Sequence, residues 1–120
     1  MISVNPSDVV LVRFPFTDLS STKRRPAVVL SPAGYSGLYK DVVIMALTSK
    51  EQDKEYCLKY WREAGLAKVT WVKPVIGTVA GSLVDERLGK LHKEDMGRVR
   101  EAVLATIDDV FLEKQRPSTS

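Results

Sequence analysis

Residues 17–30 read TDLSSTKRRPAVVL, a polar loop that leads directly into a short apolar run. Pro26 fixes its own φ and biases Arg25 towards an extended conformation, which ties the last guanidinium of the loop to a strand end. Arg offers planar, permanently charged donors that suit phosphate oxygens. The loop therefore predicts a phosphate-binding segment, with a solvated basic loop as the plain alternative.

Short apolar or alternating segments on both sides of this loop predict a β-rich fold. The expected strands are Asp8–Phe16, Pro26–Leu30, Val42–Leu47, Glu55–Tyr60, Val69–Val72 and Gly81–Val84. Pro and Gly separate the later segments, and no helix of useful length lies between any two of them. This spacing predicts a small, strongly curved antiparallel barrel of five to seven strands.

The pattern changes to helical spacing near the C-terminal end. Apolar residues recur at intervals of three and four at Met96, Val99, Val103, Ile107, Val110 and Phe111. Glu94 and Asp95 in the first turn and Lys114 in the last match the helix dipole. We therefore predict a helix over about 93–114 that packs on its own barrel, with apolar surface left for a second subunit as the alternative.

Composition is that of one small intracellular domain. The 120 residues include 18 Lys and Arg against 15 Asp and Glu, a net charge of +3 that is compatible with nucleic-acid binding without being diagnostic of it. Cys57 is the only cysteine, which excludes an intramolecular disulfide and favours a cytoplasmic protein. No apolar run resembles a signal peptide or membrane span. We expect a single domain over 1–115 and a disordered tail at 116–120.

Several segments together resemble the MazF/PemK (Kid)-like toxin family, and its PemK-like branch in particular. The resemblance extends from about Pro6 to Val110 and rests on DVVLV at 8–12, RPAVVLSP at 25–32, VVIMALTS at 42–49, WREAGL at 61–66 and LGKL at 88–91. It implies an SH3-like barrel with a C-terminal helix, assembled as a homodimer. It also implies the toxin of a type II toxin–antitoxin system, an endoribonuclease that cleaves single-stranded RNA without metal or other cofactor and is inhibited by a cognate antitoxin.

The resemblance also assigns candidate site residues. Arg25, before the proline, and Thr48, at the end of the next strand, match the family's catalytic positions. Ser20, Ser21 and Ser49 fall where the family contacts RNA. The loop itself predicts phosphate contacts at Lys23 and Arg24, and further RNA contacts are expected at Lys73 and Thr78. The last two are the nearest polar substitutes for an Arg and an Asp of the family, because Gly77 and Ala80 stand in this region. A catalytically weak or inactive barrel that binds RNA or a protein is therefore the alternative function.

The residues present suit a reaction whose nucleophile belongs to the substrate. One His and one Cys cannot supply a zinc site. In RNA the 2′-OH can attack the adjacent phosphate in line, so the protein has to hold that geometry and stabilise charge on the phosphorane. The permanently charged Arg25 fits charge stabilisation better than proton transfer, and Thr48 can donate a hydrogen bond to a non-bridging oxygen.

Four other residues have functional and structural interpretations. His92 could be a general base, but its place before the helix acids favours a capping or surface role. Cys57 alternates with apolar residues and is expected to pack as a small hydrophobe. Trp61 and Trp71 could stack on bases, although core or dimer packing is the preferred interpretation.

Overall fold

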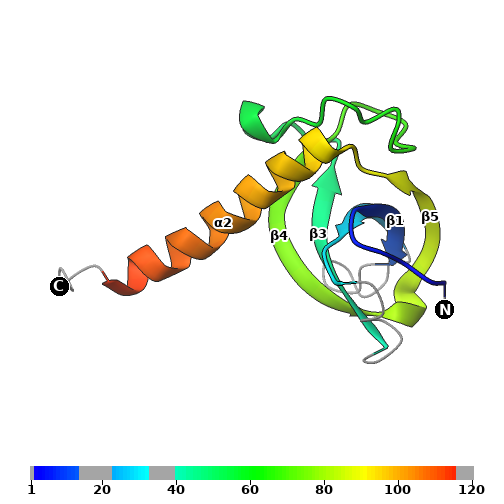
Figure 1. The fold of residues 1–120 in the computed structure, drawn as a ribbon, viewed down its shortest axis with the longest axis horizontal. Coiled ribbons are helices and arrows are strands. Elements are labelled where there is room, and N and C mark those ends of the chain that lie inside the picture. Colours follow the sequence, from blue (N-terminus) through cyan, green and yellow to red (C-terminus); the bar gives the residue numbers. More distant parts are fainter. Residues whose placement is uncertain (1, 14–22, 33–39, 116–120) are drawn as a thin grey trace.

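Antiparallel strands form one curved sheet in the computed structural model, which describes residues 2–13, 23–32 and 40–115. The strands are β1 (Asp8–Arg13), β2 (Arg24–Val29), β3 (Asp41–Thr48), β4 (Trp71–Ala80) and β5 (Val84–Lys90). Their order is β4-β3-β2-β1-β5, so β4 and β5 are the edges and the sheet is not closed within the described residues. Figure 1 shows β4 and β5 curving around the central strands. The predicted fold class, a mainly β, small SH3-like antiparallel barrel with one C-terminal helix, is confirmed, with the difference that the described sheet stays open.

Both faces of the central strands are buried, which explains their continuous apolar runs. On one face, Val10, Val29 and Ile44 belong to a cluster enclosed by the curved sheet. On the other, Val28 and Met45 belong to a cluster that includes residues of the 58–66 segment and the C-terminal helix. Because successive strand residues point to opposite faces, each central strand needs apolar side chains at nearly every position.

The helix α2 (Lys93–Gln115) follows β5 and matches the predicted range. Its first half packs on the sheet, where Val99 and Ala102 are buried. Beyond that point the helix extends away from the sheet (Figure 1), and Leu104 and Ile107 are each 42% exposed. The predicted packing is therefore confirmed for the first half of the helix, while the side chains of Val110 and Phe111 lie outside the described residues.

The prediction of a strand at Glu55–Tyr60 is wrong. A short 3-10 helix, η1 (Lys54–Tyr56), occupies its start, and only Cys57 forms an isolated bridge, with Trp71 of β4. The backbone N–H groups of Lys59 and Tyr60 donate to a side chain instead, the buried carboxylate of Asp95, at 2.9 and 2.8 Å. With those donors used, this segment cannot continue as a strand of the ladder.

The two last predicted strands are displaced. The expected strand at Val69–Val72 is the beginning of the longer β4, which continues past Pro74 because the register with β3 shifts there. A proline is tolerated at such a position, on an edge strand with an irregularity. The expected strand at Gly81–Val84 is instead the turn η2 (Gly81–Leu83), and β5 starts at Val84.

Two further predictions concern the ends of the chain. The tail predicted at 116–120 lies outside the described residues, as do residues 14–16 of the first predicted strand. The single domain over 1–115 stays a prediction. No helix in the described part of the chain has the length and apolar character needed to cross a membrane.

Candidate functional site

The candidate site lies at the end of the sheet where the pairing between β2 and β3 stops. The two strands pair from Val29 opposite Ile44 to Ala27 opposite Ala46, and their pairing ends there. Pro26, the next residue of β2, has no N–H with which to extend the ladder. Continuing the same register by two residues on each strand places Arg25 opposite Thr48.

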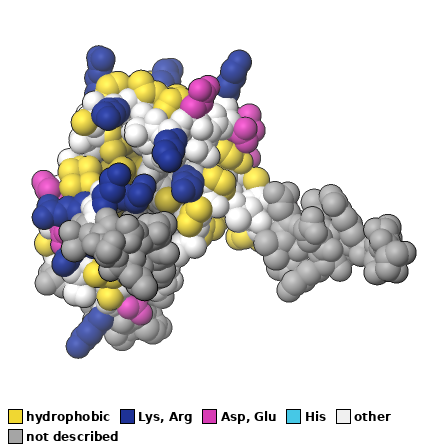
Figure 2. Space-filling view, turned by 180° about the vertical axis from the view of Figure 1, so that it is seen from behind, with side chains coloured by type: hydrophobic (Ala, Val, Ile, Leu, Met, Phe, Trp, Pro, Cys, Tyr) yellow, Lys and Arg dark blue, Asp and Glu magenta, His cyan; other side chains and the backbone are white. Residues whose placement is uncertain are grey.

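A cleft of about 470 Å³ lies at this end of the sheet. Its lining includes five cations and three hydroxyl side chains around a partly apolar floor, and no carboxylate among the described residues. The cations are Lys23, Arg24, Arg25, Lys50 and Lys68; the hydroxyls are Thr48, Ser49 and Thr70; the floor includes Leu11, Pro26, Leu47, Leu66 and Leu88. Figure 2 shows Lys and Arg side chains gathered on one face of the molecule, with hydrophobic side chains between them.

Two sequence motifs form one wall of the cleft by packing against each other. Gly65 has φ +83°, and a Cβ there would collide with the backbone oxygen of Leu88. A Cβ on Gly89 would lie 2.6 Å from the backbone oxygen of Ala64. Both positions therefore need glycine, and their contact brings the Gly-Leu segment of residues 65–66 alongside β5.

A β-bulge contributes to the same wall. Along β5, Gly89 pairs with Val9 and Arg87 pairs with Val10, so Leu88 has no partner on β1. A bulge changes the direction of the extra residue's side chain. Leu88 thereby both packs on the core and lines the cleft.

The two proposed catalytic side chains differ in how they are held. The Thr48 hydroxyl oxygen accepts a hydrogen bond of 3.1 Å from the backbone N–H of Lys50. Arg25 is exposed, and within the described residues its guanidinium makes no hydrogen bond or ion pair. The Thr48 oxygen is thus held by a hydrogen bond, whereas no described residue occupies the donors of Arg25.

The structure brings together five of the predicted site residues. Lys23, Arg24, Arg25, Thr48 and Ser49 all line the cleft. The catalytic and RNA-binding roles assigned to them stay predictions.

The other four predicted site residues are not part of this lining. Lys73 and Thr78 are exposed on β4 and do not line the cleft. Ser20 and Ser21 lie outside the described residues. Any contact of these residues with RNA stays a prediction.

Sequence analysis missed three polar residues of the cleft, Lys50, Lys68 and Thr70. Lys50 directly follows the Thr-Ser pair at the end of β3, so its position next to Thr48 could have been inferred. Lys68 and Thr70 lie beyond the Gly-Leu segment. They lie just before β4, whose first residue, Trp71, pairs with Thr48, so the β3–β4 register brings them to the cleft, and no local pattern indicates that pairing.

None of the four remaining candidates lines the cleft. His92 caps α2, because its Nδ1 accepts a hydrogen bond of 3.1 Å from the N–H of Glu94, and its ring stacks on Tyr60 with centroids 3.9 Å apart. The capping role predicted for His92 is therefore confirmed. Trp61 packs against the core, and neither Trp61 nor Trp71 lines the cleft. Cys57 is half-buried.

No cluster of three or more His, Cys, Asp and Glu side chains suited to a metal ion occurs among the described residues.

Solved structures of MazF proteins have the same fold. MazF from Deinococcus radiodurans superposes with a TM-score of 0.71 at 21% identity, covering 90% of this chain and 99% of that one. MazF in a MazE–MazF complex from the same organism gives 0.72 at 19% identity, with coverages of 89% and 98%. An endoribonuclease from a mycobacterial species gives 0.69 at 17% identity, with coverages of 90% and 94%. At these identities the likeness establishes the MazF-type fold.

The sequence assigns the family directly. A family model for PemK-like, MazF-like toxins of type II toxin–antitoxin systems matches residues 5–107. The chain belongs to this family, which confirms the resemblance found in the sequence motifs. No curated protein matches the chain in sequence.

Proposed function

We propose that this chain is the endoribonuclease toxin of a type II toxin–antitoxin pair and that it cleaves single-stranded RNA. The 2′-OH attacks the adjacent phosphate, leaving a 2′,3′-cyclic phosphate and a 5′-OH. The observation that carries the proposal is the convergence of Arg25, Thr48 and four further cations on one cleft whose described lining contains no carboxylate. Such a cleft attracts a polyanion and provides preorganised donors for a phosphorane.

Arg25 and Thr48 have complementary roles in this reaction. The Arg25 guanidinium stabilises charge on the phosphorane oxygens, for which its fork of donors is suited. The Thr48 oxygen already accepts from the Lys50 N–H, so its own proton is available to a non-bridging phosphate oxygen. Neither role requires a metal ion, in agreement with the single His and single Cys of the sequence.

The other cations of the cleft hold the RNA backbone. Lys23, Arg24, Lys50 and Lys68 surround the cleft and neutralise phosphates on either side of the reacting one. The apolar floor between them suits an unstacked base, as single-stranded RNA presents. Further contacts along the RNA come from Ser49 in the cleft, from Lys73 and Thr78 on β4, and from Ser20 and Ser21.

The basic cleft and the exposed apolar residues support two proposals about partners, an antitoxin and a second copy of the chain. MazF of Deinococcus radiodurans has been solved in a complex with MazE, and a mycobacterial endoribonuclease in a complex with its cognate antitoxin. For this chain we propose a cytoplasmic antitoxin whose acidic segment folds over the basic cleft. We also propose a homodimer, supported by exposed Val75 and Ile76 on the edge strand β4 and by Leu104 and Ile107 on α2. A strictly monomeric mass at micromolar concentration would contradict the dimer.

A binding module without catalysis is the second candidate. Gly77 and Ala80 stand on β4 where the family commonly has Arg and Asp, and a Cβ built on Gly77 meets nothing within 4 Å. The side chain that would project from that position is therefore missing, and the space is open. If that side chain is essential for cleavage, the cleft binds RNA without cutting it.

Incubation of the purified protein with a long single-stranded RNA, followed by mapping of the product ends, separates the two candidates. The endoribonuclease gives 5′-OH and 2′,3′-cyclic phosphate ends in excess EDTA. A 2′-deoxy substitution on the 5′ side of the scissile phosphate abolishes cleavage and largely preserves binding. Products with 5′-phosphate, or cleavage lost with EDTA, contradict the mechanism. Binding without cleavage of any RNA favours the module.

A further inference from the structure

A second β-bulge in β5 places an acidic side chain beside the cleft. Glu86 pairs with Leu11 of β1 and Val84 pairs with Val12, so Asp85 between them has no partner on β1. The extra residue of a bulge is freed from the regular alternation, and its side chain is redirected. Asp85 is thereby available to residues of β1 and β2.

Asp85 forms ion pairs with two arginines that face each other across these strands. Arg13 of β1 lies directly opposite Arg24 of β2. The Asp85 Oδ1 atom is 3.1 Å from Nε of Arg13, and its Oδ2 atom is 3.1 Å from Nε of Arg24. The Asp85 side chain is only 19% exposed, whereas the two arginines are about half exposed. One largely buried carboxylate therefore separates and holds two like charges that would otherwise repel each other.

The two arginines differ in which of their guanidinium donors are used by described residues. Nη2 of Arg13 donates to the backbone oxygen of Ser82 at 3.2 Å, which turns that guanidinium away towards η2. Arg24 lines the cleft, and in the described part of the chain its Nη groups have no partner. Asp85 contacts Arg24 at Nε, and no described residue is hydrogen-bonded to the Nη groups, so that edge of the guanidinium can meet a ligand.

We propose that Asp85 is a positioning residue for RNA binding, holding the Arg24 guanidinium so that its Nη groups meet a phosphate of the substrate. This inference rests on the proposed function. An unrestrained Arg at an exposed strand end would lose rotamer freedom on binding, and a side chain already held by an ion pair loses less. The carboxylate thus strengthens binding to an anion despite its own negative charge.

This role predicts a sign opposite to that of simple charge counting. Replacing Asp85 by Asn removes one negative charge next to a polyanion, so charge counting predicts tighter RNA binding and a steeper dependence on salt. Positioning predicts weaker binding and a shallower dependence, because Arg24 loses its orientation. The two effects can be separated by measuring affinity over a range of salt concentrations.

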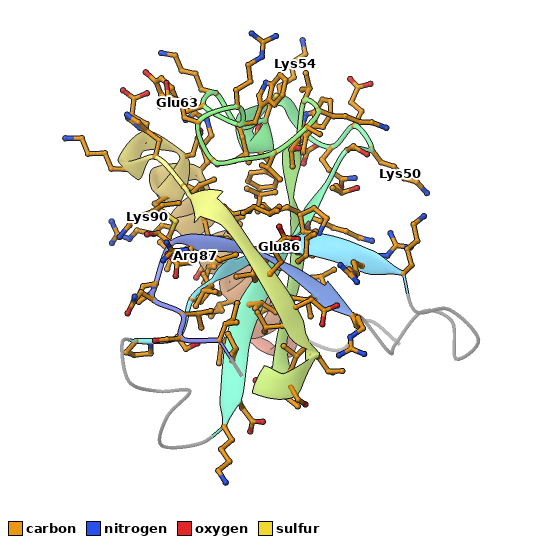
Figure 3. The ribbon with its side chains drawn as sticks, turned by 90° about the vertical axis from the view of Figure 1, so that its right-hand side faces the viewer. Lys50, Lys54, Glu63, Glu86, Arg87 and Lys90 are labelled. Atoms are coloured by element: carbon orange, nitrogen blue, oxygen red, sulfur yellow. The ribbon has the colours of Figure 1, made fainter. Side chains whose placement is uncertain are left out.

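The test compares Asp85→Asn, Arg24→Gln and the double variant, with Glu86→Gln as a control. Glu86 is exposed on the same strand (Figure 3), and its replacement makes the same change in charge. The probe is a fluorescein-labelled single-stranded RNA with 2′-O-methyl groups throughout, which the proposed reaction cannot cleave. Fluorescence anisotropy gives the affinity at each salt concentration, and thermal unfolding shows whether each variant is folded.

We expect Arg24→Gln to weaken binding about three- to tenfold and to reduce the salt slope by about 0.7, as for one lost phosphate contact on a single strand. Asp85→Asn should show a similar loss, and the double variant should bind no worse than Arg24→Gln alone, because both changes remove the same contact. Asp85→Glu, which keeps the charge, should recover part of the loss. Glu86→Gln should bind as well as the unmodified chain or slightly better.

Other results overturn the inference in recognisable ways. Tighter binding by Asp85→Asn shows that its charge alone acts on RNA. Additive losses of affinity in the double variant show that Asp85 does not act through Arg24. Unchanged binding by Arg24→Gln shows that Arg24 makes no contact with an RNA phosphate. Failure of the unmodified chain to bind the probe contradicts the proposed function, and the inference with it. If Asp85→Asn does not fold, Arg13→Gln/Asp85→Asn, which also removes the repelling charge, replaces it in the same comparison.

Discussion

The backbone N–H of Lys50 donates a hydrogen bond of 3.1 Å to the hydroxyl oxygen of Thr48. Strand β3 therefore ends in a turn that is closed by the side chain of its own last residue. This bond fixes the position of the Thr48 oxygen and uses one of its lone pairs, while the hydroxyl proton stays available. A ligand in the cleft meets a donor that needs little further ordering, which is the property expected of a group that stabilises a transition state.

Replacing Arg25 by Ala should reduce RNA cleavage about 10²–10³-fold, the usual effect of removing one preorganised donor. Stability should change by less than about 0.5 kcal/mol, because Arg25 is exposed and makes no hydrogen bond or ion pair within the described residues. Arg25→Lys should recover little, since an ammonium group cannot reproduce the guanidinium fork. Single-turnover rates and thermal unfolding measure both effects, with exposed Arg100→Ala on α2 as the control.

Thr48→Ala should also lower the cleavage rate by about 10²–10³-fold, whereas Thr48→Ser should retain most of it. Serine keeps an oxygen that can accept from Lys50 and a proton that can be donated. Thr106 provides a control, because its hydroxyl donates to Ala102 within α2 and does not line the cleft. Equal rates for Thr48→Ala and Thr48→Ser would show that the hydroxyl has no part in the reaction.

Lys50→Gln and Lys68→Gln should each weaken binding of single-stranded RNA and reduce the salt slope by about 0.7. Both residues line the cleft, although no sequence pattern assigned them to it. Lys90→Gln makes the same change in charge and should leave binding nearly unaltered, because Figure 3 places Lys90 on the opposite side of the molecule from Lys50. A uniform effect of all three would mean that RNA responds to net charge and not to this cleft.

His92→Ala should leave the cleavage rate close to that of the unmodified chain and lower the free energy of unfolding by about 1 kcal/mol. The variant loses the acceptor for the Glu94 N–H and the stacking on Tyr60. Asparagine is a favourable capping residue, so His92→Asn should restore part of the stability. Denaturant titration with a parallel RNA assay checks this. A loss of rate with stability unchanged would instead assign His92 to the chemistry.

Asp95→Ala should lower the free energy of unfolding by about 3 kcal/mol. The fully buried carboxylate accepts from the N–H groups of Lys59 and Tyr60 and pairs with Arg98 at 3.0 Å. Its loss leaves these donors unsatisfied. Glu94→Ala, at a neighbouring and half-exposed position, should cost much less. Urea midpoints of the two variants make the comparison, and similar midpoints would contradict the role of Asp95.

The central strands were predictable because burial on both faces leaves continuous apolar runs in the sequence. The segment around Tyr56 and Leu58 also has an alternating pattern, since one side of it rests on the core. Alternation shows which side chains are buried, but it does not show where the backbone donors go. Here Asp95, more than thirty residues later in the chain, takes them.

The site was predictable to the extent that it follows from strand register. Arg25 and Thr48 end neighbouring strands, and each belongs to a motif that can be read locally. Lys68 lies just before β4 and is brought to the cleft by the pairing of Trp71 with Thr48, and Asp85 reaches Arg24 through a bulge. Both arrangements depend on tertiary packing. A period-two pattern in the sequence assigns each strand residue to one face and does not show where a bulge interrupts the alternation.

Because of the two bulges, the number of residues in β5 determines which side chains reach the cleft and Arg24. Five residues of β1, Asp8 to Val12, pair along seven residues of β5, from Lys90 back to Val84. The two surplus residues are Leu88, in the wall of the cleft, and Asp85, against Arg24. A substitution in β5, except at Gly89, changes one side chain and leaves the pairing with β1 in place. A deletion of one residue from β5 either removes a bulge, and with it the side chain of Leu88 or Asp85, or shifts the register and moves the following side chains to the opposite face. The cleft should therefore tolerate most substitutions in β5 better than a deletion.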